Sequence, residues 1–304
     1  MLINAQNLEL AFKGFKTLIT DAYMAAPAQA EKIFMRVPSA SADETYGWLG
    51  AFPNMHEWIG PRVINNLTSQ TFTIKNRTFE STVGVHRDNI ADDKLGLFKP
   101  VFQEMGQTAK RHPDELIFAL LAAGFTTTCY DGQNFFDTDH PVTDANGADI
   151  QISNMQAGSG PAWYLLDTSR AIRPMIWQER EGYEFQTLAN ASDPNVFFNN
   201  EYIYGIHARV NAGFGLWQLA FGSKAELNDT NYAAARAAMM TFKSDGGRLL
   251  GVTPTTLVVP PSLESKALAL LNTEHKDGGG SNPWKGTAET IVTPYLAKPL
   301  WTAF

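Results

Sequence analysis

Hydrophobic residues recur at helical spacing over one unusually long stretch, from Asp92 to Gly124. The apolar positions are three or four residues apart, which places them on one face of a helix. They are Leu95, Phe98, Phe102, Met105, Ala109, Leu116, Leu120 and Ala123. His112 fills the one gap in this series. Asp92 and Asp93 suit a helix start, where carboxylates meet free N–H groups, and Gly124 suits the end.

Two prolines qualify this long helix. Pro100 and Pro113 each remove one backbone hydrogen bond. The run from His112 to Glu115 also has the pattern of a fresh helix start. We expect one kinked helix of roughly 45 Å, with two separate helices as the alternative. Such a rod predicts an elongated subunit rather than a compact enzyme with a cleft.

The N-terminal segment, residues 2–26, also has helical spacing. Its apolar positions are Leu8, Phe12, Phe15, Ile19 and Tyr23. This pattern fits an amphipathic helix packed on the chain's own core. It fits equally well a mobile arm that packs on a neighbouring subunit, in which case Phe12 and Phe15 would make the contact.

Residues 37–91 are rich in Gly, Pro, Asn and Thr, and β-forming residues alternate with polar ones. Phe72 and Ile74 alternate before a turn-like Lys75–Arg77, and Phe79, Val83 and Val85 alternate after it, which predicts a hairpin. Upstream, aromatic residues that include Trp58 are spread over an irregular stretch, residues 46–62. They indicate either an interface or packing under the long helix.

Beyond the long helix, residues 142–160 are polar and predict a surface loop or boundary. From about residue 162 to residue 272 the pattern is mixed. Short strands are predicted at 163–166, 174–177, 202–206, 217–221, 257–259 and 290–293, and helices at 232–240 and 262–271.

Composition narrows the function classes. The chain has 304 residues, 44% hydrophobic and 18% charged, so it can bury a large core. Its net charge of −7 argues against a protein that grips DNA through phosphates. Cys129 is the only cysteine, so no internal disulfide can form, which fits a reducing cytoplasm. We find no signal peptide pattern and no apolar run of the length of a membrane span, so we expect no membrane association.

One cluster invites a chemical interpretation. Cys129, Asp137, Asp139 and His140 fall within twelve residues. A thiol nucleophile needs a base in hydrogen-bond reach, and no local signature of a cysteine enzyme is present. The cluster also lacks the ligand spacing of zinc or calcium sites. We therefore expect a turn held by aspartate side chains, with no catalytic residue, no cofactor and no metal site in this chain.

Several strings, in order along nearly the whole chain, resemble the major head subunit of Mu-like phages and prophages, the gpT family. They include residues 79–85, 92–93, 129–141, 163–167, 173–174, 204–205, 208–209, 217–220, 256–261, 281–282, 286 and 292–296. The resemblance implies an α+β protein with the Hong Kong 97-type capsid fold. That fold has an N-terminal arm, an extended E-loop, a peripheral domain with a long spine helix, and an axial domain.

The resemblance also implies boundaries and contacts. The expected parts are the arm (1–38), the E-loop and start of the peripheral domain (39–91), the peripheral domain with the spine helix (92–161), the axial domain (162–275) and a return to the peripheral domain (276–304). An E-loop lies on a neighbouring subunit. We therefore expect inter-subunit contacts from Trp58, Arg62, Lys75, Arg77 and Glu80 of the E-loop and from Phe12 and Phe15 of the arm.

The implied function is that of a major capsid protein, made in the host cytoplasm and assembled into an icosahedral virion shell of hexamers and pentamers. The expected partners are copies of itself, a separate scaffolding protein or protease, a portal and a decoration protein. The shell would enclose double-stranded DNA without sequence-specific binding. The alternatives are a cytosolic thiol hydrolase that uses Cys129 and His140, and another ring-forming or encapsulating phage protein.

Overall fold

A computed structural model describes residues 5–49, 72–92, 95–188, 190, 193–276 and 279–297. The helices are α1 (Ala5–Ala25), α2 (Arg87–Ala91), α3 (Leu95–Ala123), α4 (Pro194–Asn199), α5 (Asp229–Met240) and α6 (Glu264–Leu271). The short 3-10 helices are η1 (Ala30–Lys32), η2 (Trp217–Leu219), η3 (Pro261–Leu263) and η4 (Pro294–Ala297).

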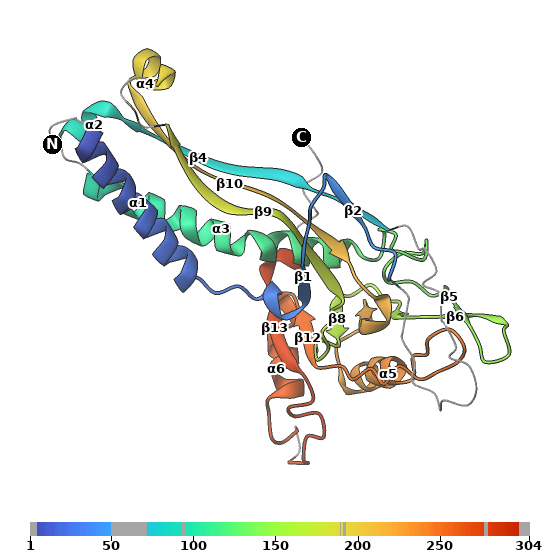
Figure 1. Ribbon diagram of the computed structural model, residues 1–304. Coiled ribbons are helices and arrows are strands. Elements are labelled where there is room, and N and C mark those ends of the chain that lie inside the picture. Colours follow the sequence, from blue (N-terminus) through green and yellow to red (C-terminus); the bar gives the residue numbers. More distant parts are fainter. Residues whose placement is uncertain are drawn as a thin grey trace.

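The strands pair into four sheets within the described residues. They are β1 (Phe34–Pro38), β2 (Asp43–Thr45), β3 (Thr73–Lys75), β4 (Arg77–His86), β5 (His140–Thr143), β6 (Asp149–Ile152), β7 (Met155–Gln156), β8 (Trp163–Leu166), β9 (Met175–Leu188), β10 (Glu201–Phe214), β11 (Ala220–Ser223), β12 (Thr256–Val259) and β13 (Glu289–Val292). Figure 1 shows an elongated molecule in which α1 and α3 run alongside β4, β9 and β10. A second sheet, with β8, β12 and β13, lies toward the end away from α4.

Helix α3 is the long element that the sequence predicts. It is one helix of 29 residues, about 44 Å at ~1.5 Å per residue, so the alternative of two separate helices is wrong. Pro100 and Pro113 both lie inside it. Asp114 does not begin a new helix. Its carboxylate accepts hydrogen bonds from the backbone N–H groups of Gln29 (3.1 Å) and Ala30 (2.8 Å), at the start of η1.

Helix α1 packs on α3 of the same chain. The ring of Phe15 stacks on that of Phe102, with centroids 4.0 Å apart, and meets Tyr204 edge-on. Phe12 stacks on Phe185 of β9. The contact of Phe12 and Phe15 with a neighbouring subunit stays a prediction. The amphipathic face of the helix is already covered by apolar surface within the chain, so both rings are used inside this subunit.

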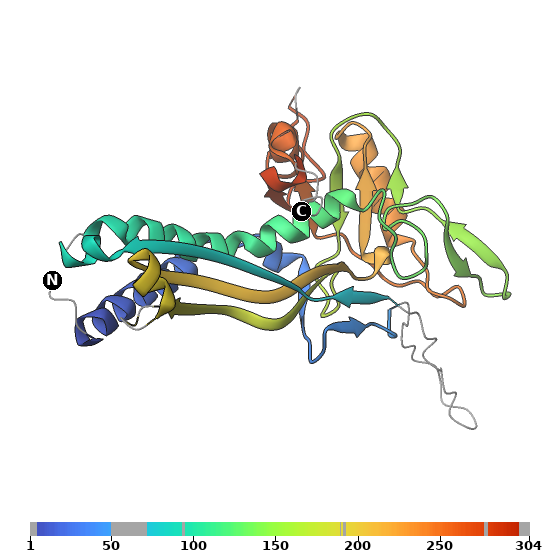
Figure 2. The same cartoon turned by 90° about the horizontal axis from the view of Figure 1, so that it is seen from above.

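A four-stranded sheet, in the order β1-β9-β10-β4, lies along the two helices. Strand β1 is parallel to β9, whereas β9, β10 and β4 are antiparallel neighbours. Along β10 the side chains alternate strictly between buried and half-buried, from Tyr202 to Val210. The buried set packs against α1 and α3, which makes a two-layer structure of helices on a sheet (Figure 2).

The second sheet has the order β13-β12-β8-β11-β7, and α5 and α6 pack beside it. This arrangement corrects two predicted boundaries. The range 162–275 is not one unit, because its strands β9 and β10 belong to the four-stranded sheet. Among the described residues of the range 276–304, β13 pairs with β12 in the five-stranded sheet, and η4 contacts α3.

The hairpin predicted across Lys75–Arg77 is also wrong. Strand β3 pairs with β2, and β4 pairs with β10, so the two segments join different sheets. Asn76 forms the joint between them: its backbone N–H donates to Ala42 and its amide group donates to Ser39 and Ser41. Trp58 and Arg62 lie outside the described residues.

His112 stands in the apolar face of α3, at the position where it filled the gap in the sequence pattern. Its ring lies edge-on to Phe79, with centroids 4.4 Å apart, and packs near Trp177. Its Nδ1 atom is 2.6 Å from the hydroxyl of Tyr183. Burial, followed by the positive charge of Arg77, lowers the pKa of His112 to about 4. The side chain is therefore a neutral part of the core at pH 7.

The close packing of α1 on α3 predicts that one added methyl group at Gly106 lowers the stability of the subunit. Gly106→Ala should destabilise the subunit by about 1–3 kcal/mol, because the new Cβ would lie 2.3 Å from the carbonyl oxygen of Ile19 in α1. Gly96→Ala is the matched control in the same helix, since nothing lies within 4 Å of a Cβ there. Urea unfolding of the unassembled subunit compares the two. Equal stability would show that α1 does not pack on α3 at this point.

The neutral His112 predicts a pH dependence of stability. The unfolded chain binds a proton near pH 6.5 and the folded one only near pH 4, so stability should fall as pH falls through this window. The loss from this group is at most about 3 kcal/mol. His112→Gln should flatten that part of the profile, measured as unfolding free energy between pH 7 and pH 4. Parallel profiles for the two proteins would contradict the assignment.

Candidate functional site

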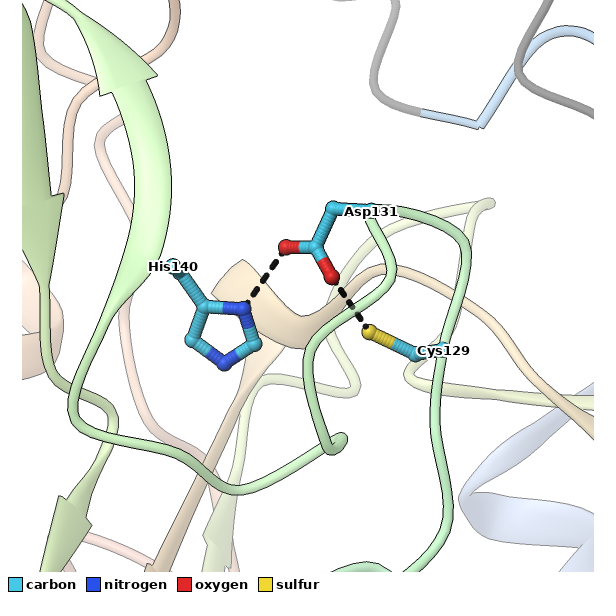
Figure 3. Close-up of side chains that lie close together, drawn as sticks. All are labelled: Cys129, Asp131 and His140. Carbon is cyan, nitrogen blue, oxygen red and sulfur yellow. Dashed lines mark hydrogen bonds and ion pairs between the residues drawn. The ribbon is translucent and has the colours of Figure 1, made fainter.

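The loop after α3 and the first strand beyond it bring three reactive side chains together (Figure 3). The Cys129 sulfur lies 3.1 Å from Oδ1 of Asp131, and the His140 Nδ1 atom lies 2.7 Å from Oδ2 of the same carboxylate. All three side chains are largely buried. Asp131 links the thiol to the imidazole, whereas the sequence pattern had pointed to Asp137 and Asp139.

The order of the three groups does not suit a thiol nucleophile. Such an enzyme places the imidazole between the thiol and the carboxylate, so that the imidazole removes the thiol proton. Here Asp131 lies between Cys129 and His140 (Figure 3). Burial, reinforced by the charge of Asp131, raises the pKa of the Cys129 thiol far above its usual range. The thiol stays protonated and donates to the carboxylate, which opposes nucleophilic attack.

A stacked ring and two hydrogen-bond partners hold the His140 side chain. Its ring stacks on Trp217, with centroids 4.0 Å apart and an interplanar angle of 11°. Its Nε2 atom is 3.2 Å from Oδ1 of Asn154, whose amide nitrogen is 2.8 Å from the carbonyl oxygen of Phe135. Burial opposes ionisation of Asp131, but the hydrogen bond and charge from His140 outweigh it and lower the pKa of this carboxyl. The network fastens the loop to η2 and to the start of the hairpin β5–β6.

The same three residues are the group with metal-ligand chemistry in the described part of the chain. One ligand atom from each of Cys129, Asp131 and His140 lies within 4.8 Å of the others. Zinc takes four ligands, and no fourth Cys, His or carboxylate among the described residues joins this group. The carboxylate already bridges the other two by hydrogen bonds. The three side chains are therefore bonded to one another as a buried fastening.

The surrounding turn is held by aspartates, as predicted. Asp131 accepts from the backbone N–H of Gln133, and Asp137 accepts from those of Asn134 and Thr138. Each bond replaces one that regular secondary structure would supply. Asp131 and Asp137 therefore shape the loop through hydrogen bonds to its backbone.

The expected E-loop contact residues that the structure describes lie on the outside. Lys75 ends β3, and Arg77 and Glu80 lie on β4; all three side chains are exposed. The Arg77 guanidinium lies over the ring of Phe79, 5.4 Å from its centroid. Strand β4 is at the edge of its sheet, and the exposed charges make this edge polar.

The buried network of Cys129, Asp131 and His140 predicts that a substitution of Asp131 lowers the stability of the subunit. Asp131→Asn should destabilise the subunit by about 1.5–3 kcal/mol, because it replaces the charged acceptor of two buried hydrogen bonds, those to Cys129 and His140. Asp149→Asn, at an exposed position of β6, is the control and should cost no more than about 0.5 kcal/mol. Unfolding midpoints in urea provide the comparison. An Asp131→Asn midpoint equal to that of the control would rule out the role given to this network.

Known proteins agree with this architecture along most of the chain. Residues 8–296 match the family described as Mu-like prophage major head subunit gpT. The major capsid protein of Escherichia phage Mu is 46% identical over 280 residues, which cover 89% of this chain and 92% of that protein. In the described residues, no helix has the length and apolarity to cross a membrane.

Solved structures of phage capsid subunits have the same fold as this chain. A chain of the procapsid of bacteriophage JBD30 has a TM-score of 0.87 and 45% identity, over 96% of this chain and 100% of that one. A chain of the JBD30 capsid decorated with minor capsid protein trimers has a TM-score of 0.72 and 36% identity, over 89% and 91%. The predicted Hong Kong 97-type capsid fold is confirmed. The chain belongs to the Mu-like prophage major head subunit gpT family and has the α+β fold of phage capsid proteins.

Proposed function

We propose that many copies of this chain assemble into the icosahedral head of a Mu-like phage or prophage, a closed shell of hexamers and pentamers around double-stranded DNA. The observation that carries this proposal is the close match, over 96% of the chain, to a subunit of the JBD30 procapsid. The chain's own physical character supports it. It is elongated, and its clustered reactive side chains are buried and bonded to one another.

The partners follow from the same role. The shell would be built with a separate scaffolding protein or protease and a portal. A decoration protein is supported by the minor capsid protein trimers of the JBD30 capsid. DNA would be enclosed without sequence-specific contacts, because a chain with net charge −7 offers little attraction to phosphates. The protein would reside in the virion after synthesis in the host cytoplasm.

The E-loop side of the molecule would contact a neighbouring subunit. Lys75, Arg77 and Glu80 are exposed charges where β3 passes into β4, and Trp58 and Arg62 belong to the same part of the chain. Charges at the rim of an interface set register and partner choice more than affinity. We assign these five residues to the alignment of neighbouring subunits in the lattice.

Electron microscopy of the purified, assembled chain tests the proposal directly. Closed shells are the expected product. Rings would favour another ring-forming phage protein, and monomers under all assembly conditions would oppose a capsid role. The thiol hydrolase is disfavoured by the geometry itself, since Asp131 separates Cys129 from His140 and the thiol is protonated.

Charge reversal tests the E-loop assignment. Lys75→Glu with Arg77→Glu should reduce shell yield at least tenfold, because a small repulsion recurs at every contact in the lattice. The fold should tolerate it, since exposed charge changes cost within about 0.5 kcal/mol. Lys16→Glu with Lys243→Glu is a control with the same change in net charge at other exposed positions. Shell yield is counted by electron microscopy. An equal loss in both variants would point to total charge, not to this surface.

A further inference from the structure

The hairpin formed by β5 and β6 projects from the end of the molecule away from α4, as Figure 1 and Figure 2 show. Its tip carries Asn146 and Gly147, the only Asn–Gly pair in the sequence. Both residues are exposed. In such a pair the backbone nitrogen of the glycine attacks the side-chain amide of the asparagine readily, because glycine has no Cβ to hinder the approach. The tip therefore holds the two groups that a spontaneous deamidation requires.

The surroundings of this pair leave the reaction open. Gly147 has φ at 83°, and no atom of the described residues lies within 4 Å of the place that a Cβ would take there. The Asn146 amide nitrogen is 3.4 Å from Oδ2 of Asp144, which is a long hydrogen bond in an exposed turn. The backbone N–H of Gly147 donates to the carbonyl oxygen of Asp144 at 3.2 Å. The turn therefore has to open before this nitrogen reacts, and the opening of an exposed turn with few contacts costs little free energy.

Residues elsewhere with related chemistry are better protected. Asn154 is buried, and its amide group is held by hydrogen bonds to backbone carbonyl oxygens. Asp131 precedes Gly132, but its carboxylate is bonded to the thiol and the imidazole of the buried network. Asn282 precedes Pro283, whose nitrogen carries no proton and cannot form the ring. The hairpin tip therefore combines exposure, a following glycine and a weakly held amide.

We propose that Asn146 is deamidated spontaneously through a succinimide formed with Gly147, and that the product loosens the tip of the β5–β6 hairpin. The Gly147 nitrogen loses its proton to water or hydroxide and bonds to Cγ of Asn146. The bond between Cγ and the amide nitrogen then breaks, and this nitrogen takes a proton from water and leaves as ammonia. Water opens the ring at one of its two carbonyl groups. The product is aspartate, or isoaspartate, in which the backbone runs through the side chain and gains one carbon atom.

The new carboxylate lies beside one that is already charged. Asp144 accepts hydrogen bonds from the backbone N–H groups of Ala148 (2.9 Å) and Asn146 (2.7 Å), which lower the pKa of this carboxyl. After deamidation, the group that donated to Asp144 is an anion that repels it. In isoaspartate the added carbon atom also displaces the residues that close the turn. The base of the hairpin is held separately, because the backbone N–H of Thr143 donates to Asp245 at 2.9 Å, so the loosening stays at the tip.

Peptide mapping by mass spectrometry follows the modification in the full chain at mildly alkaline pH. Residue 146 of the folded subunit should convert to aspartate and isoaspartate within roughly tenfold of its rate in the same chain unfolded in urea, since tenfold corresponds to about 1.4 kcal/mol for opening of the turn. Asn154 should stay intact in the folded subunit. The rate at residue 146 should rise with pH, because the attacking nitrogen has to lose its proton. Conversion in the unfolded chain with none at residue 146 of the folded subunit would overturn the proposal.

Hydrogen exchange of residues 144–148 tests the effect on the hairpin. Aged wild-type protein and fresh Asn146→Asp should both exchange these backbone hydrogens roughly tenfold faster than fresh wild-type protein, which corresponds to about 1.4 kcal/mol. Aged Asn146→Gln should exchange as the fresh protein does, because its longer side chain forms the ring far more slowly. Gln151→Glu is the charge control, since it adds one negative charge at an exposed position of the same hairpin and should leave the exchange unchanged. Equal exchange in fresh and aged wild-type protein, after residue 146 has converted, would overturn the proposed loosening.

Discussion

The stacked contact between Phe15, Phe102 and Tyr204 is the constraint on which the long half of this subunit depends. It joins α1, α3 and β10 at one point, and all three rings are buried. An elongated subunit has much surface for its volume, so each element can be covered on only one side. Aromatic residues meet this need because each buries a large area and packs in defined geometries. Loss of the contact would expose the apolar faces of two helices at once.

Helix α3 also connects two separate groups of buried residues. Phe102 and Met105 belong to the group formed with α1 and the long sheet, whereas Ile117 and Phe118 belong to the larger group around the five-stranded sheet. His112 stands between these groups on the same helix. Because this single helix takes part in both cores, it joins the two halves of the subunit. This arrangement fits a structural protein better than an enzyme.

Chemically reactive side chains serve the fold in this protein. Cys129, Asp131 and His140 could support catalysis or metal binding in another order, but here a carboxylate separates the thiol from the imidazole. Their burial against Trp217 removes them from any substrate. The surfaces that remain open are of a different kind: the charged strand β4, and the aromatic α4. The contact between copies through the charged strand β4 is our proposal.

The sequence by itself determined the elements whose pattern is local. The long helix, most strand and helix positions beyond residue 162, and the aspartate-held turn after Cys129 follow from spacing, capping and turn chemistry. Trp217–Leu219, predicted as part of a strand, forms the short 3-10 helix η2. The ordered family strings added the capsid fold, which local pattern could not supply. Only the tertiary structure decided which segments pair. It assigned β3 and β4 to different sheets, moved β9 and β10 beside α3, and placed Phe12 and Phe15 within their own subunit. It also left Phe197 and Phe198 exposed. The physical reason is that periodicity fixes which face of an element is apolar, but partners far along the chain decide what covers that face.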